Sequence, residues 1–289
     1  MSLVREKRII NLNAANATQY LNGDYLSDVV FDFPNILSPS DNVSYTEIGI
    51  GSAEIVASFY NVDTFNNVFN YRVASVNYSI IVPPGSYNYN SLISQLTTSF
   101  AVNGHTFAFT LNRNSNILTM TLTSPFTWNS INASSIYYIL GFDANTTYTI
   151  VANTITFPNL FNLIGIKNLK VSSSKISLDS FDSKNAATTN LLATISVNVP
   201  NFNLIIYSNL DSLYSHCRSS YISTIDIQIK DDNDNFVNFN RVAWNITLNL
   251  ILYRRIDKII DKLQLPNNTI DSEDIPIPPL GGANEVSVR

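Results

Sequence analysis

The segment from Arg241 to Tyr253 alternates between apolar and polar side chains with a period of two. In an extended backbone successive side chains point to opposite faces of the strand, so one face is apolar and the other carries mainly amides and hydroxyls. The apolar face consists of Val242, Trp244, Ile246, Leu248, Leu250 and Leu252. Such a strand is typical of an antiparallel sheet that packs on a second layer, and it therefore predicts a β-sandwich.

Composition favours broad protein contact over binding to nucleic acid. Charged residues make up only 13% of the 289 residues, and asparagine is about as frequent as all four charged types together. Amide-covered surfaces lose their water at lower cost than charged ones, which suits protein–protein contact. The net charge of −5 and the pI of about 4.9 give no general electrostatic footprint for nucleic acid.

The same alternation recurs in residues 24–83 and 158–255, and it predicts about eight or nine strands, including a single strand at Asn70–Val82 and a short one at Phe236–Phe239. Eight strands in two sheets make a jelly roll. Residues 1–23 have no such pattern and are expected to form an irregular N-terminal arm. Its basic stretch Arg5-Glu6-Lys7-Arg8 is either solvated or touches nucleic acid or a partner's acidic surface, and nucleic-acid contact elsewhere is not expected.

Residues 84–157 interrupt the strand pattern. Tyr89, Leu92, Ile93, Leu96 and Phe100 form one stripe of an amphipathic helix, with Asn88 or Asn90 as its N-cap. A hairpin over 106–123, a short helix before Gly141 and a strand near 147–157 follow. The sequence therefore predicts a mainly β protein, a single jelly-roll β-sandwich with a small inserted α+β domain at 84–157.

The end of the chain has a third character. Ile256, Ile259, Ile260 and Leu263 form a helical stripe that ends before Pro266, and a Pro- and Gly-containing tail completes residues 256–289. Residues 1–20 lack the apolar core of a signal peptide, and no apolar run approaches the ~18 residues that span a bilayer. The single cysteine, Cys217, excludes an intramolecular disulfide framework and favours a reducing compartment.

Candidate chemical groups are few. His216 and Cys217 are adjacent, so in an extended chain they point apart and make a poor nucleophile–base pair. His105 follows a helix end and is interpreted as a turn residue. Residues 231–235 (Asp-Asp-Asn-Asp-Asn) resemble the start of a calcium loop, but Phe236 replaces the glycine at the sixth position, so a hairpin turn is preferred over a cation site. We therefore expect no enzyme, no cofactor, no metal and no catalytic residues.

Two regions carry a family resemblance. One is the run from Val82 to Leu96, Val-Pro-Pro-Gly-Ser-Tyr-Asn-Tyr-Asn-Ser-Leu-Ile-Ser-Gln-Leu, with Tyr138-Ile-Leu-Gly-Phe142 beyond the hairpin. The other is Ile225–Asp231 followed by Val237–Leu248. Together they resemble the penton (minor capsid) proteins of virophages and related polinton-type viruses, over roughly residues 20–255.

The resemblance implies a virion protein. It implies a single jelly roll with an inserted domain, five copies of which form a homopentamer at each vertex of an icosahedral capsid, beside a trimeric major capsid protein. Related viruses mature their capsids with a protease that cuts at Gly-Gly. Gly282, within Gly281-Gly282-Ala283, is therefore a candidate processing site, although Pro279 stands where that pattern has an aliphatic residue.

Two other functions stay open. A carbohydrate- or receptor-binding module at the virion surface could use aromatic side chains such as Tyr137, Tyr138 or Trp128. A hydrolase on a β-sandwich would need clustered carboxylates or a histidine-centred site, and the acidic residues are scattered over turns. The vertex protein is therefore the preferred interpretation.

Overall fold

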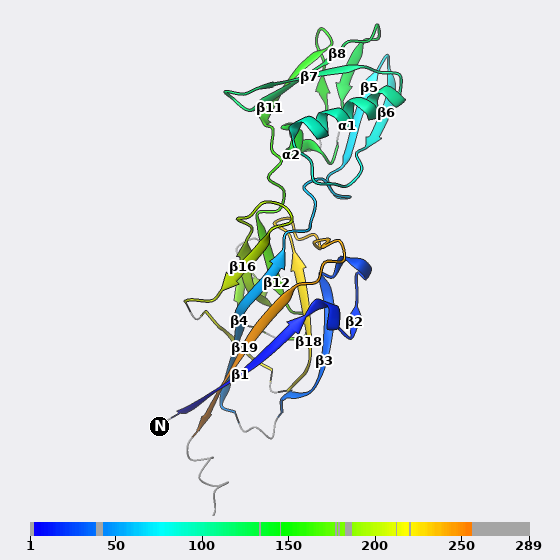
Figure 1. The fold of residues 1–289 in the computed structure, drawn as a ribbon. Coiled ribbons are helices and arrows are strands. Elements are labelled where there is room, and N and C mark those ends of the chain that lie inside the picture. The colour runs from blue at the N-terminus through cyan, green and yellow to red at the C-terminus, as the bar shows by residue number, and fades with distance from the viewer. Residues whose placement is uncertain are drawn as a thin grey trace, which may run out of the picture.

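The protein has two hydrophobic cores. The computed structural model describes residues 3–38, 43–132, 134–144, 146–176, 178, 180–182, 187–211, 213–219 and 221–255. One core draws on residues 10–59 and 169–252, and the other draws on residues 62–161. Figure 1 shows the unit around the second core standing at one end of the first unit, with the N-terminus at the opposite end. The Gly282 site and the helix and tail at 256–289 lie outside the described residues.

The first unit is a β-sandwich of two antiparallel sheets. The first sheet has the order β1-β19-β4-β16, with β17 also paired to β4: β1 Leu3–Asn13, β19 Asn245–Arg255, β4 Tyr45–Val56, β16 Leu204–Ser208 and β17 Ser215–Cys217. The second has the order β15-β12-β18-β3-β2: β15 Leu191–Ser196, β12 Asn168–Ser172, β18 Ile222–Lys230, β3 Asp28–Leu37 and β2 Gln19–Tyr20. Short elements complete it: η1 Ala14–Asn16, η2 Gly23–Tyr25, β13 Ser180–Asp182 and β14 Ala187–Thr189.

The apolar face of β19 lies in the core between the two sheets. Trp244, Ile246, Leu248 and Leu250 are each at most 1% exposed, and the indole Nε1 of Trp244 donates to the carbonyl of Leu26 over 2.7 Å. The predicted mainly β sandwich is therefore confirmed. The strand begins at Asn245, and residues 237–244 before it are irregular. The short strand expected at Phe236–Phe239 is reduced to one bridge between Phe236 and Lys230.

The expectation of an irregular arm at residues 1–23 is wrong, because Leu3–Asn13 is a full-length strand, β1. It pairs with β19 over its whole length, from Leu3 opposite Arg255 to Asn13 opposite Asn245. Ile10 and Leu12 point into the core, and Glu6 on the same face binds Arg8 and Arg254. Charge at these alternate positions concealed the period of two.

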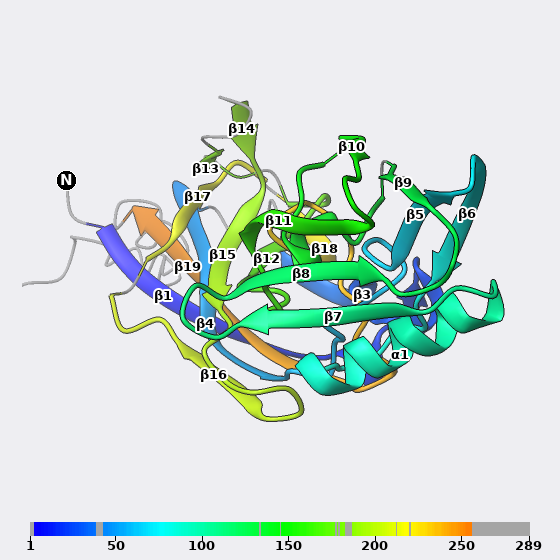
Figure 2. The ribbon, with the colours of Figure 1, turned by 90° about the horizontal axis from the view of Figure 1, so that it is seen from above.

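The second unit contains two sheets and two helices. Its first sheet has the order β10-β9-β5-β6, and the second has the order β11-β8-β7. The elements are β5 Val68–Val73, β6 Val76–Ile81, α1 Tyr89–Val102, β7 Phe107–Asn112, β8 Ile117–Leu122, β9 Trp128–Ile131, α2 Tyr137–Leu140, β10 Tyr148–Thr149 and β11 Thr154–Leu160. Figure 2 shows α1 alongside β7. Helix α1 agrees with the predicted apolar stripe, and Asn88, one of the two candidate caps, accepts from the backbone N–H of Ser91.

The observed pairing differs from the expected boundary at residues 83 and 84. The single strand expected near 70–82 is the hairpin β5–β6, which turns at Ala74 and Ser75, and β5 pairs with β9 rather than with a strand of the sandwich. Phe69, Tyr71 and Val73 are fully buried in the second core. The second unit thus begins near Val62, about twenty residues before the expected position, and its core extends to Phe161.

Asn61 holds together the two segments that connect the units. Its Oδ1 accepts from the backbone N–H of Tyr87 over 2.8 Å, and its Nδ2 donates to the carbonyls of Tyr87 (2.8 Å) and Leu163 (3.1 Å). Gly165 passes so close that a Cβ there would lie 3.1 Å from the Cβ of Asn61, and its φ of +72° also favours glycine. The outgoing and returning segments are therefore fixed to each other.

A buried carboxylate fixes the turn that follows β12. Asp226 on β18 is 1% exposed and accepts four hydrogen bonds, from the Ser173 hydroxyl (2.5 Å), the Ser174 backbone (2.8 Å) and hydroxyl (2.6 Å), and the Lys175 backbone (2.8 Å). Burial raises the pKa of Asp226, but these hydrogen bonds together outweigh it and hold the pKa below its ordinary value of 3.8.

We expect Asp226→Asn to lower the free energy of unfolding by roughly 2–4 kcal/mol. The substitution removes the charge from the hydrogen bonds, and it places the side-chain NH2 group against N–H or O–H donors that the carboxylate accepted from. Chemical denaturation at neutral pH measures this. Asp32→Asn, an exposed side chain on β3 that accepts one bond from Thr224, is the matched control and should change stability by about 0.5 kcal/mol or less. Equal effects of both substitutions would contradict the assignment.

The stabilisation by Asp226 should also depend on pH. Its folded pKa lies below 3.8, so the unfolded chain takes up the proton first on acidification. The contribution is fully present above 3.8 and is lost as the pH falls through the folded pKa. The difference in unfolding free energy between wild type and Asp226→Asn should therefore narrow on acidification, and a difference that stays constant would oppose this account.

Candidate functional site

His216 and Cys217 lie on opposite faces of β17. His216 is exposed and pairs in register with Glu47, whereas Cys217 is 4% exposed and belongs to the sandwich core. Burial raises the pKa of the Cys217 thiol, which disfavours the thiolate that nucleophilic chemistry needs. The two side chains therefore do not form a nucleophile–base pair.

His105 is buried in the second unit, whereas the sequence indicated a turn residue. It is 3% exposed, its Nδ1 lies 3.0 Å from the hydroxyl of Tyr71, and its ring packs edge-on against Tyr78 at 4.6 Å. Asn103 donates to the same Tyr71 hydroxyl over 3.1 Å. The sequence signal at Gly104 indicates the end of α1 but not the direction in which the next side chain points.

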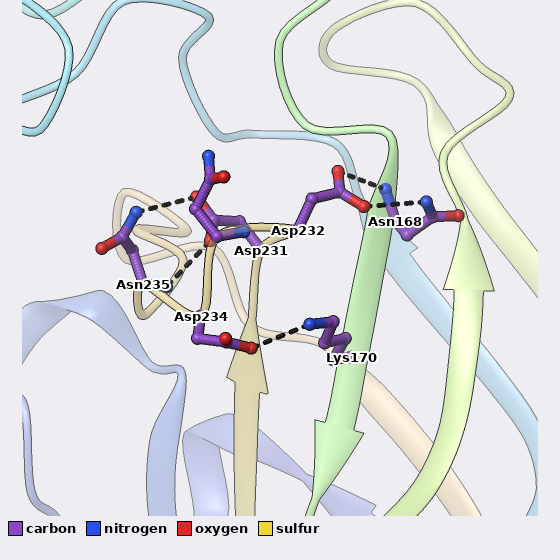
Figure 3. Close-up of polar contacts among 7 residues, drawn as sticks. Asn168, Lys170, Asp231, Asp232, Asp234 and Asn235 are labelled. Atoms are coloured by element: carbon purple, nitrogen blue, oxygen red, sulfur yellow. Dashed lines mark hydrogen bonds and ion pairs between the residues drawn. The ribbon is translucent and has the colours of Figure 1, made fainter. Parts of the chain in front are cut away.

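Residues 231–235 form a turn that binds itself. The backbone N–H of Asp231 donates to the carbonyl of Asn235 over 2.8 Å, and Asp231 Oδ1 accepts from the backbones of Asn233 and Asn235, each over 2.8 Å. The Asn235 amide donates to the other carboxylate oxygen of Asp231 over 3.2 Å. Figure 3 shows Asp231 and Asn235 in contact within this loop.

The remaining carboxylates of this turn face β12. Asp232 accepts from the backbones of Lys167 and Asn168 and from the Asn168 amide, the last over 2.8 Å, and Asp234 binds Lys170 Nζ over 2.8 Å (Figure 3). The oxygens that a cation would need thus accept from N–H donors. Within the described part of the chain, no group of three or more His, Cys, Asp and Glu side chains could hold a metal ion.

The three aromatic residues proposed for sugar stacking are not equally available. Trp128 is fully buried, and its indole donates to the carbonyl of Ser130 over 3.1 Å. Tyr137 and Tyr138 are half-buried, with ring centroids 5.6 Å apart, and the Tyr138 hydroxyl accepts from Asn66. Trp128 therefore cannot stack on a ligand without unfolding its core.

A larger cleft lies where the first sheet approaches β3. Its volume is about 480 Å³, and its lining is mostly amides, hydroxyls and apolar groups: Asn11, Leu12, Asn13, Asn16, Thr18, Phe31, Asp32, Phe33, Ser52, Ala53, Glu54, Asn245, Ile246 and Thr247. Several of these groups already bind each other, such as Asn13 with Asn245 (2.8 Å) and Thr247 with Asn11 (3.0 Å). The lining holds two carboxylates and no histidine or cysteine, so it offers polar recognition rather than nucleophilic chemistry.

The outer face of the first sheet is a further candidate interaction surface. On β1 the basic stretch divides between the two faces, since Glu6 and Arg8 point inward while Arg5, Lys7 and Ile9 are exposed on the outer face. Arg8 donates to the carbonyl of Ile36 over 2.5 Å and to Glu6 over 3.0 Å. Only Arg5 and Lys7 thus present positive charge outward from this stretch.

The opposite edge of that sheet is apolar. Alternate residues of β16 point outward, and apolar side chains just before and after the strand are exposed with them. We call this set the β16 patch: Phe202 (62% exposed), Leu204 (46%), Ile206 (71%), Leu210 (88%) and Leu213 (68%). A sheet edge with exposed apolar side chains is a site for association with another chain.

Comparisons with known proteins give a structural likeness and no match in sequence. No family model matches the chain, and no curated protein matches it. Among solved structures, the chain is similar to the crystal structure of the mavirus penton protein, with a TM-score of 0.46 and 10% sequence identity, covering 87% of this chain and 100% of that one. Within the described ranges, no helix has the length and hydrophobicity that a bilayer crossing requires.

His105 should make stability depend on pH. Burial lowers its pKa from the ordinary 6.5, so on acidification the unfolded chain binds a proton first. The neutral imidazole contributes its full stabilisation above 6.5, and this is lost as the pH falls below that value. We expect the difference in unfolding free energy between wild type and His105→Gln to shrink from pH 8 to pH 5, about the range in which histidine titrates; parallel curves would contradict it.

Proposed function

We propose that this chain is a structural capsid protein whose sandwich is a jelly roll, and that five copies close a vertex of an icosahedral shell. The observation that supports the proposal is the nesting of its strand pairs. In chain order the sandwich strands of five or more residues in the described ranges are β1, β3, β4, β12, β15, β16, β18 and β19. The first pairs with the last, the second with the seventh, the third with the sixth and the fourth with the fifth.

A hairpin of four nested pairs that is rolled into two sheets has the topology of a jelly roll, an architecture common in viral capsids. The inserted unit lies between the third and fourth of these strands and stands at one end of the sandwich (Figure 1). Both edges of the first sheet are consequently left uncovered by it. A closed ring of identical subunits needs two different complementary surfaces on each copy, and the two edges are candidates.

The residue chemistry supports an assembly role. Part of the outer face of the first sheet carries amides and hydroxyls, among them Asn11, Asn13, Asn245 and Thr247. The carboxylates described above are held by N–H donors, as expected of structural groups. In this reading the chain is not an enzyme, needs no cofactor, and has as partners its own copies and a major capsid protein in the virion.

Native mass measurement tests the proposal. We expect the purified chain, alone or mixed with its major capsid protein, to give a particle of five times the 32.2 kDa chain mass and to enter assembled shells. A chain that stays monomeric under both conditions and never enters shells would exclude the vertex role.

The 480 Å³ cleft supports a second candidate, a carbohydrate- or receptor-binding surface on the same virion protein. Its volume is in the range of ligand sites, and amides with aromatic neighbours suit neutral polar ligands such as sugars. A glycan array distinguishes this role. Binding that is lost in Asn245→Ala and kept in Tyr137→Ala would assign it to the cleft, whereas an array without hits would remove it.

A further inference from the structure

The two edges of the first sheet differ in chemistry. The β16 edge carries the β16 patch together with an exposed carboxylate, Asp211, which follows Leu210. The β1 edge carries the exposed cations Arg5 and Lys7 and the exposed Ile9, which is 60% accessible. One edge is thus apolar and acidic, and the other is apolar and basic.

The complementary groups also lie at the same level along the strands. Ile9 is opposite Asn249, and Asn249 is opposite Gly49 in the strand register. Leu213, which lies shortly before β17, passes over the sheet at this point, since its carbonyl oxygen lies 2.7 Å from where a Gly49 Cβ would be. Ile9 and Leu213 therefore lie at the same level along the strands, both on the outer side of the sheet.

The protruding part of the β16 edge is held in place. The backbone N–H of Asn209 donates to the carbonyl of Gly51 over 3.0 Å. The Asn209 side chain donates to the carbonyl of Leu213 over 2.7 Å and accepts from its N–H over 2.8 Å. Leu210, Asp211 and Leu213 are therefore presented from a fixed base, so little ordering is needed when a partner binds.

We infer that the occupant of the β16 edge is the β1 edge of a second copy of this chain. Leu210 and Leu213 of one copy pack on Ile9 of the next, and Asp211 faces Lys7. This inference rests on the proposed function and names the contact that would close its ring. The two surfaces are different and lie on opposite edges of one sheet, so the contact is head to tail and repeats around a ring.

Charge excludes the simplest alternative, in which two β16 edges meet across a twofold axis. That contact would bring Asp211 of one copy towards Asp211 of the other, and the β16 patch contains no cation to offset the two charges. It would also stop at a dimer. Pairing with β1 instead joins opposite charges and leaves both edges of every subunit occupied.

A charge exchange tests the contact. Lys7→Glu and Asp211→Lys should each raise the concentration at which the native assembly half-forms by roughly tenfold or more, and the double variant Lys7→Glu/Asp211→Lys should restore assembly to near wild type. Leu210→Ser/Leu213→Ser should weaken assembly at least as much, because the contact removes both leucine side chains from water. Sedimentation or native mass measurement over a concentration series gives the values.

Matched controls lie on the inserted unit, where Arg113→Glu and Val102→Ser change exposed side chains of the same kinds. Both should assemble as wild type. If wild type forms closed rings that none of the edge variants weakens, or if the double variant fails to recover while its thermal unfolding is unchanged, the β1–β16 contact is wrong and the vertex role stands. A wild-type chain that stays monomeric overturns both.

Discussion

The pairing of β19 with β1 on one side and β4 on the other is the constraint on which the sandwich depends. β19 places Trp244, at its entrance, and Leu248 and Leu250 in the core, and it positions both neighbours by its register. It is also the last strand of the described chain, while β1 is the first. The first sheet can therefore be completed only after residues of the first and last described strands have met.

Nested pairing has a consequence for folding order. Contacts between residues far apart in sequence are slow to form, because the connecting chain must lose entropy before the contact stabilises it. The second unit, by contrast, encloses its own core within residues 62–161. It can fold while the outer pairs of the sandwich are still open, and Asn61 then fixes its outgoing and returning segments beside each other. An insertion is tolerated between β4 and β12 because the hydrogen bonds of Asn61 join the outgoing and returning segments where they leave the sandwich.

Local patterns predicted elements well and their partners poorly. The stripe from Tyr89 to Phe100 and the Asn88 cap are local properties, and α1 agrees with both. The hairpin β5–β6 has the same period of two as the sandwich strands, so alternation alone does not say which sheet receives it. β1 was concealed for a different reason, since Glu6 and Arg8 occupy inward positions at the end of the sheet, where Arg254 and a backbone carbonyl satisfy them. His105 gave no signal, because its burial depends on strands distant in sequence.

Hydrogen bonds to the carboxylates explain why these acidic residues do not form a reactive site. Asp226, Asp231 and Asp232 each accept from several N–H or O–H donors and thereby hold turns against neighbouring strands. Carboxylates that are saturated in this way are poor bases and poor cation ligands, but they fix the rims of the sheets. Rigid rims matter for an assembling subunit, because a contact between preformed edges loses less entropy than one between mobile loops. Asp211 and Lys7, by contrast, do not hold a turn. They lie on the two edges that we infer a neighbouring copy would contact.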